Sequence, residues 1–542
     1  MRTATLIAKR VGRFLVVLIA CSVGLCSLLL LLGFISRNYT TLGKSYKPVG
    51  RPLNGDLNLD NPVPFARVQR SDIQIGLSCS GGGSRAAYFT AAILTEIQRW
   101  QEKSANDKPE ANLLTRINSI SSVSGGSLAA AYFVLNHSSL VSSPTDSQAW
   151  REYLEKMAVS YRRREWSPTA LLPTAWFKLL FTNYNRGLIA RDDYDRTLFD
   201  GKAMSALPDQ PALYINSFDV ANHVRFVFSK AFVNTTLYQP PGWWGALSAP
   251  QEITSENDLC FCRVDPSSVK IADAVYASSA FPVAYPNLAM QHFGSKILFQ
   301  GSLIFLADGG LADNSGLVTL LTQMKAAMEP GRKGGLLLVL YVDATTDRID
   351  TNGSKFQKQG IENKYAWHDT LIGHGIQSID SGNALVQDLS WIFLENNGVV
   401  TDQLNMNWPM DLKKKPKGNC DWSKASFDAS FASGELALRP CVIRLGLRDL
   451  ADPDFPKRFL DKHDSRLQAL LEANGIKEVG AYDPAPGLPE RLQEIKTDFA
   501  LSGPDRRALD LAAYLLVNGK LVGDLATWHE VAATVADKNS SQ

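Results

Sequence analysis

Short apolar runs of strand length alternate along the chain with segments whose apolar residues recur at helical spacing. Bounded runs of this length predict buried strands, and recurrence every three to four residues predicts helices. Strands are expected at residues 73–77, 117–123 and 335–342, a strand pair at 212–232, and helices at 86–100 and 128–135. Strands that alternate with helices predict an α/β fold, in which helices cover both faces of a central, mostly parallel sheet.

The first 35 residues follow a different pattern. Residues 14–35 contain no charged residue, and a helix of this length can cross a bilayer core of about 30 Å. Basic residues precede this run and predict an inside N-terminus, so the remaining chain is expected outside the cytoplasm, in a periplasm or lumen. We therefore expect an uncleaved single-pass anchor, with cleavage as a lipoprotein at Cys21 as the alternative.

Composition shifts divide the rest of the chain. Residues 36–70 are polar and predict a linker, residues 71–345 predict the main folded domain, and residues 346–542 predict a mostly helical extension that packs on it or completes it. A helical insertion is expected at about residues 148–207. The net charge is only +2, and the basic residues form no stripe along the sequence. Neither feature gives a reason to expect a nucleic-acid partner. The seven cysteines lack zinc-site spacing, so neither a metal nor another cofactor is expected.

Two glycine-rich segments each lie between a predicted strand and a predicted helix. In the first, Gly81, Gly82 and Gly83 can turn consecutive backbone N–H groups into one concavity at a helix N-terminus. In the second, Ser124 is followed by Gly125 and Gly126, small residues that a sharp strand-to-helix turn around a nucleophilic serine requires. Ser122 stands where the usual G-x-S-x-G pattern has its first glycine.

The third segment is a D-G-G turn formed by Asp308, Gly309 and Gly310. The order S-G-G-G-x-R, S-x-S-G-G and D-G-G resembles the patatin-like phospholipase family. Residues 277–282 are similar to that family's A-S-x-A-x-P segment, so the resemblance covers four patches between residues 73 and 345.

This resemblance implies a three-layer α/β/α fold with a catalytic dyad and no catalytic histidine. Ser124 would be the nucleophile that carries the acyl group, and Asp308 would be its base. The amides of Gly81, Gly82 and Gly83, with Arg85 supporting the loop, would bind the oxyanion. The implied substrate is a phospholipid or another acyl lipid at a membrane, and the sequence identifies no protein partner.

Three alternatives remain open. A Ser–Asp–His triad could use His368, His374 or His463. An inactive lipid-binding scaffold would explain the altered elbow glycine, and a transacylase could use the same dyad. Large apolar residues at 173–181 and 238–247 suit either contact with lipid or packing in the core.

Overall fold

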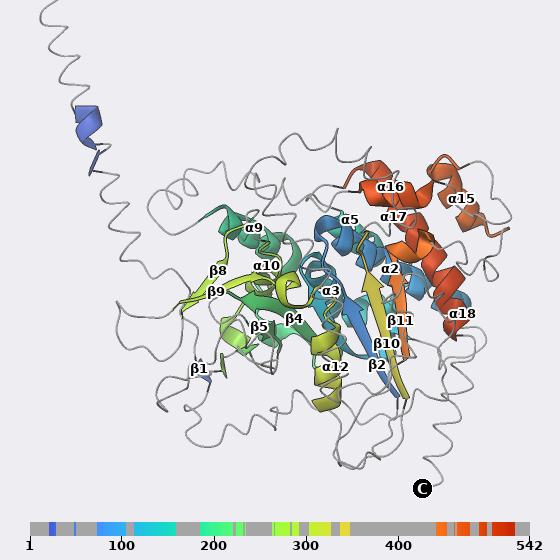
Figure 1. Ribbon diagram of the computed structural model, residues 1–542, viewed down its shortest axis with the longest axis horizontal. Helices are drawn as coiled ribbons and strands as arrows, with labels where there is room; N and C mark the ends of the chain where they lie inside the picture. The colour runs from blue at the N-terminus through green and yellow to red at the C-terminus, as the bar shows by residue number, and fades with distance from the viewer. Residues whose placement is uncertain are drawn as a thin grey trace, which may run out of the picture.

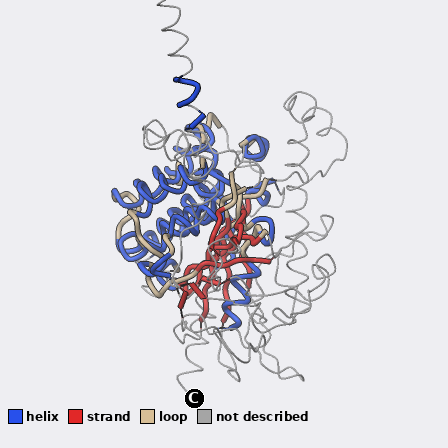
Figure 2. Tube along the Cα trace, turned by 90° about the vertical axis from the view of Figure 1, so that its left-hand side faces the viewer, coloured by secondary structure: helices blue, strands red, loops and turns tan. Residues whose placement is uncertain are grey.

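The computed structural model shows a sheet flanked by helices (Figures 1 and 2). It describes residues 21–25, 27–28, 48–49, 73–104, 113–158, 185–220, 224–230, 233–234, 263–264, 266–281, 285–291, 303–326, 336–346, 441–451, 460, 463–476, 487–495 and 501–525. Most of the expected anchor and linker lies outside these residues, as do residues 173–181 and 238–247. Within the described ranges, no helix has the length and apolar character needed to cross a membrane.

The central part of the sheet is parallel, as the sequence predicts. Its strands run in the order β4-β3-β2-β10-β11, and each pairs in parallel with its neighbour. They are β2 (Ile73–Cys79), β3 (Ile117–Val123), β4 (Ala212–Asp219), β10 (Leu336–Asp343) and β11 (Cys441–Gly446). The carboxyl ends of parallel strands lie at one edge of a sheet, so the turns after β2 and β3 meet there.

An antiparallel part continues the sheet beyond β4. Strand β4 pairs with both β5 and β9, and β9 pairs with β8. The strands of this part are β5 (Val224–Phe228), β8 (Leu288–Gln291), β9 (Leu303–Asp308), β6 (Val233–Asn234), β7 (Arg263–Val264) and β1 (Pro48–Val49). The predicted strand pair at 212–232 is confirmed as β4 and β5. Strand β9 was not predicted, and its pairing places Asp308 opposite Ser217 of β4.

Helices cover both faces of the parallel strands. Helices α2 (Gly83–Ser104) and α3 (Gly125–Leu135) pack on one face with Ile75 and Leu77, while α12 (Leu317–Ala326) packs on the other. The alternation of side chains along β2 separates the two layers, because Gly76 faces α12. A Cβ added at Gly76 would lie 2.8 Å from the Met324 sulfur, so the glycine lets α12 approach closely. The predicted three-layer arrangement is confirmed.

The insertion contributes further helices on the side of α3. Trp150 and Tyr153 of α5 are fully buried against Phe133 of α3, which explains why this segment folds as an amphipathic helix. Besides α3, the helices that the structure describes between β3 and α12 are α4 (His137–Ser142), α5 (Gln148–Met157), α9 (Arg186–Tyr194), α10 (Ile271–Ser278) and α11 (Gly310–Asp313). Single turns of 3₁₀ or π type lie at Leu114–Arg116, Asp195–Phe199, Met204–Ala206, Pro266–Ser268, Leu447–Ala451 and Val517–Leu521.

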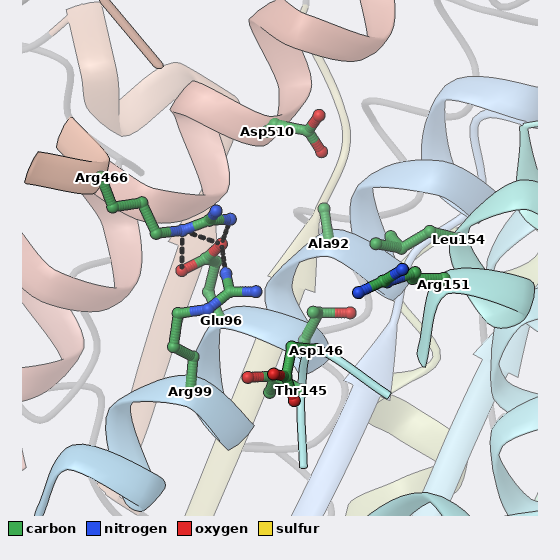
Figure 3. A pocket seen from close by; sticks show the side chains of 10 residues that line it. Ala92, Glu96, Arg99, Thr145, Asp146, Arg151, Leu154, Arg466 and Asp510 are labelled. Atoms are coloured by element: carbon green, nitrogen blue, oxygen red, sulfur yellow. Dashed lines mark hydrogen bonds and ion pairs between the residues drawn. The ribbon is translucent and has the colours of Figure 1, made fainter. Parts of the chain in front are cut away.

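The C-terminal region completes the domain. It supplies strand β11, in which Cys441 is disulfide-bonded, and a group of helices, of which α17 packs on α2 while α15 and α16 pack on α17. These helices are α15 (Ser465–Ala473), α16 (Leu488–Glu494), α17 (Gly503–Leu516) and α18 (Val522–Leu525). A polar pocket of about 350 Å³ remains between α2, the start of α5, α15 and α17 (Figure 3). On one wall of this pocket, Glu96 accepts hydrogen bonds from both Arg99 and Arg466. One carboxylate thereby links α2 to α15.

Candidate active site

Ser124 occupies a strained turn between β3 and α3. Its backbone dihedrals are φ 49° and ψ −123°, in a region that residues with a Cβ rarely adopt, and its residue surface is 8% exposed. Such a conformation costs about 1–3 kcal/mol and persists only where the surrounding structure imposes it. The predicted sharp strand-to-helix turn is therefore present, with Ser124 at its apex.

Gly125 and Gly126 allow this turn to pack against the preceding loop. A Cβ on Gly125 would lie 1.9 Å from the carbonyl oxygen of Gly83, and one on Gly126 would lie 2.5 Å from that of Ser80. Side chains at these positions would push α3 away from the loop, so close backbone approach explains both glycines. Ser122 fits because its hydroxyl donates to the carbonyl of Tyr214 at 3.4 Å, within the sheet.

The glycine loop lies beside Ser124. Gly82 and Gly83 have φ of 137° and 60°, and a Cβ on Gly81 would lie 3.4 Å from Ser124 Cβ. The Gly81 N–H donates to the carbonyl of Asn314 at 3.0 Å. We expected the Gly81 N–H to bind the oxyanion, but this group already donates its hydrogen bond within the protein. The candidate donors are therefore Gly82 and Gly83, at the N-terminus of α2, where the helix dipole favours negative charge.

Arg85 has a different orientation from the one expected of an oxyanion group. Its side chain is buried, and Nη1 donates to Thr346 Oγ1 at 2.9 Å and to the carbonyl of Ile495 at 2.8 Å. Thr346 follows β10, and Ile495 ends α16. Arg85 thus connects the first turn of α2 to the C-terminal region, which supports the loop from behind.

Asp308 lies directly against Ser124. The Ser124 hydroxyl donates to Asp308 Oδ2 at 2.7 Å, and the Gly310 N–H donates to Oδ1 at 2.8 Å. A Cβ on Gly309 would lie 2.3 Å from the carbonyl oxygen of Asn216, so this glycine lets the turn close against β4. The structure therefore brings together the serine and the aspartate that the sequence singled out.

The environment of Asp308 changes its acidity. Its residue surface is only 4% exposed, and burial raises the pKa of its carboxyl group from 3.8 to about 6, although the hydrogen bonds from Ser124 and Gly310 act in the opposite direction. A carboxylate with a higher pKa binds a proton more strongly, so it is a better acceptor for the serine proton than an ordinary aspartate.

Two further residues support the site and were not predicted to do so. Asn314 accepts the Gly81 N–H, and Ser278 Oγ accepts the Ser124 N–H at 2.8 Å. Ser278 lies in the 277–282 segment that the family resemblance marked, and Asn314 lies four residues after the D-G-G turn. Neither motif reveals which atom a residue contacts, so their roles emerge only from the structure.

Of the three histidines considered for a triad, the structure describes only His463, which is exposed and lies just before α15. His368 and His374 lie outside the described residues. The aspartate contacts the serine hydroxyl directly, at the position where a triad would have an imidazole. Among the residues that the structure describes, no cluster of three or more histidine, cysteine, aspartate or glutamate side chains could hold a metal ion.

Comparison with solved structures finds distant similarities. Human GIVD cytosolic phospholipase A2 aligns with a TM-score of 0.43 and 12% identity, over 85% of this chain and 63% of that one. Its complex with methyl gamma-linolenyl fluorophosphonate and terbium chloride aligns with a TM-score of 0.42, 12% identity and coverages of 85% and 60%. VipD from Legionella pneumophila gives a TM-score of 0.25, 11% identity and coverages of 85% and 67%. The chain thus spans less than two thirds of either phospholipase A2 structure.

A search of curated protein sequences finds no match. The family model described as patatin-like phospholipase matches residues 77–321. This range contains the glycine loop, the Ser124 turn and the Asp308 turn, in the order in which the sequence presents them. Residues 77–321 of the chain are therefore a domain of the patatin-like phospholipase family.

Proposed function

We propose that the chain is a serine lipid acyl hydrolase in which Ser124 is the nucleophile and Asp308 is its base. The observation that carries this proposal is the 2.7 Å hydrogen bond from Ser124 Oγ to a buried carboxylate, at a strained turn beside the glycine loop. A binding scaffold needs neither the strained serine nor a buried carboxylate of raised pKa. Both features impose a cost on folding and are typical of reactive sites.

In the first half of the reaction, Ser124 Oγ bonds to the ester carbonyl carbon as its proton passes to Asp308. The negative charge that develops on the carbonyl oxygen is stabilised by the N–H groups of Gly82 and Gly83 and by the N-terminus of α2. The tetrahedral intermediate then breaks the bond to the leaving alcohol, which takes the proton from Asp308. The acyl group remains on Ser124 as an ester.

In the second half, Asp308 accepts a proton from water as the water oxygen attacks the acyl-enzyme. Collapse of the second intermediate releases the fatty acid and returns the proton to Ser124. Each correctly placed oxyanion donor contributes about 10²–10³ in rate, and general-base assistance contributes about 10²–10⁴. The burial of Ser124 and Asp308 favours rate contributions of this size, because hydrogen bonds to developing charge are stronger where water is excluded.

We further propose that residues 14–35 anchor the domain to a membrane, so that the substrate is an acyl lipid presented at a surface. The uncharged run with basic residues before it supports this arrangement. The disulfide at Cys441 agrees with an oxidising compartment outside the cytoplasm. Protease accessibility of the domain in oriented membrane vesicles tests on which side of the membrane the domain lies.

A fluorophosphonate probe tests the nucleophile, since it forms a covalent bond to an activated serine. Full-length protein in detergent should be labelled, and peptide mapping should place the label on Ser124. Ser124→Ala should lose both labelling and hydrolysis of a phospholipid, while its thermal unfolding remains cooperative. An unlabelled wild-type protein would favour the inactive scaffold, and a label on another serine would reassign the nucleophile.

A further inference from the structure

The backbone N–H of Ser124 is held by a side chain from a distant part of the chain. It donates to Ser278 Oγ at 2.8 Å, and Ser278 is the last residue of α10. Ser278 Oγ also lies 3.0 Å from Ser127 Oγ, while the Ser127 N–H donates to the Ser124 carbonyl at 2.9 Å. The two ends of the strained turn are thus tied to each other and to α10. Without this acceptor, a buried N–H group would have no partner.

The backbone of the same residue holds the turn that carries Asp308. The Gly309 N–H donates to the Ser278 carbonyl at 3.1 Å, and the Asp308 N–H donates to the Ala280 carbonyl at 3.0 Å. Ser278 therefore contacts the serine turn with its side chain and the aspartate turn with its carbonyl group. The two turns come from chain segments far apart in sequence. Strand β4 pairs with the strand that precedes each turn, and Ser278 adds a direct link between the turns themselves.

We propose that Ser278 is a positioning residue of the active site, which sets the distance between the Ser124 hydroxyl and the Asp308 carboxylate. Its hydroxyl maintains the strained backbone of Ser124, and this backbone directs the Ser124 hydroxyl toward Asp308. Ser278 is fully buried at 0% exposure, behind the turn, so it acts through Ser124 and Asp308. This inference rests on the proposed hydrolase function of the dyad.

The adjacent serine provides a matched control. Ser279 Oγ bonds to the carbonyl groups of Val275 and Tyr276, within its own helix. Replacing either serine by alanine removes one buried hydroxyl from the same short segment, but only the change at Ser278 removes the acceptor for the Ser124 N–H. A displacement of about 1 Å between reacting groups can lower the rate about 10²-fold.

The test compares Ser278→Ala and Ser279→Ala in the full chain, with a phospholipid in mixed micelles as substrate. For Ser278→Ala we expect kcat to fall about 10- to 100-fold with KM within about threefold of wild type, because only the alignment of the dyad changes. The rate of fluorophosphonate labelling at Ser124 should fall by the same factor. Ser279→Ala should retain kcat within about threefold of wild type.

A second pair separates the hydroxyl group from packing. Ser278→Thr and Ser278→Val have nearly the same shape, and only threonine keeps the hydroxyl. We expect the threonine variant to be at least about tenfold faster than the valine variant, whatever the added methyl groups cost both of them. This pair decides the question if Ser278→Ala does not unfold cooperatively.

Equal kcat for the threonine and valine variants, or for the Ser278 and Ser279 alanine variants, would overturn the positioning role while leaving the hydrolase intact. A rise in KM without a fall in kcat would also overturn it, because a residue behind the turn should not alter binding. Absence of wild-type hydrolysis and labelling would instead refute the proposed function, and the role of Ser278 would be refuted with it.

Discussion

Replacing Asp308 by Asn separates the chemical role of the carboxylate from its effect on stability. The amide has nearly the same shape, and its oxygen can still accept the Gly310 N–H that now donates to Oδ1 at 2.8 Å. It cannot accept the Ser124 proton in the reaction. We therefore expect kcat to fall by about 10²–10⁴ while the variant remains folded.

The same change should alter stability in a pH-dependent way. Burial raises the Asp308 pKa from 3.8 to about 6, which corresponds to a cost of roughly 3 kcal/mol for the ionised form in the folded protein. Between these two pH values the folded protein binds more protons than the unfolded chain, so wild-type stability falls as pH rises through this window. The uncharged amide of the Asp308→Asn variant does not undergo this loss. The stability of Asp308→Asn relative to wild type should therefore increase from about pH 4 to about pH 6.5 and remain constant above it.

Thermal unfolding of both proteins in the same detergent, in a series of buffers across this range, measures the difference. Asp209→Asn is the control for activity, because the Asp209 side chain is 81% exposed and pairs with Lys230 at the surface. Its kcat should match wild type. A Tm difference between Asp308→Asn and wild type that does not vary with pH would show that Asp308 is not desolvated. A kcat within a few-fold of wild type would show that it is not the base.

Three further predictions concern packing, a buried ion pair and the N-terminal segment. Gly126→Ala should lower kcat at least about 100-fold in a steady-state ester assay, because the new Cβ would lie 2.5 Å from the Ser80 carbonyl oxygen, whereas Gly503→Ala, where a Cβ meets only the Arg507 side chain at 3.6 Å, should retain activity. Glu96→Gln should destabilise the protein by about 1–3 kcal/mol and lower its Tm without a matching fall in kcat, because Arg99 and Arg466 lose a shared carboxylate. Deleting residues 1–35 should move the protein from the membrane pellet to the supernatant in fractionation and preserve hydrolysis of a soluble ester.

Most of the parallel part of the fold could be predicted from the sequence, because β2, β3, β4 and β10 all overlap segments where strands were expected. Residues 117–123 were predicted with the bounds that the structure gives β3. The antiparallel strands were harder to predict. Residues 303–308, which form β9, are a short run that ends in the D-G-G turn, and no strand was predicted there. The parallel strand β11 was not predicted either, because it lies in the region that was expected to be mostly helical.

In the candidate site, too, some features could be predicted from the sequence and others could not. Ser124 could be singled out because a sharp strand-to-helix turn needs small residues around it, and Asp308 because the order of the three motifs resembles that of a known family. The bonding of individual groups could not be predicted. Gly81 appears equivalent to Gly82 and Gly83 in the sequence, and only the fold reveals that its N–H donates a hydrogen bond to the carbonyl of Asn314. Hydrogen bonds between distant segments depend on tertiary packing, which periodicity and motif spacing do not specify.

The geometry also explains why a domain of this kind needs a large supporting structure. A strained Ser124 and a buried Asp308 carboxylate together cost several kcal/mol, a substantial part of the net stability of a typical domain. The packing of α17 on α2 and the Arg85 bonds to Thr346 and Ile495 hold the first turn of α2, which follows the glycine loop. The C-terminal region thus supports the candidate site through α2.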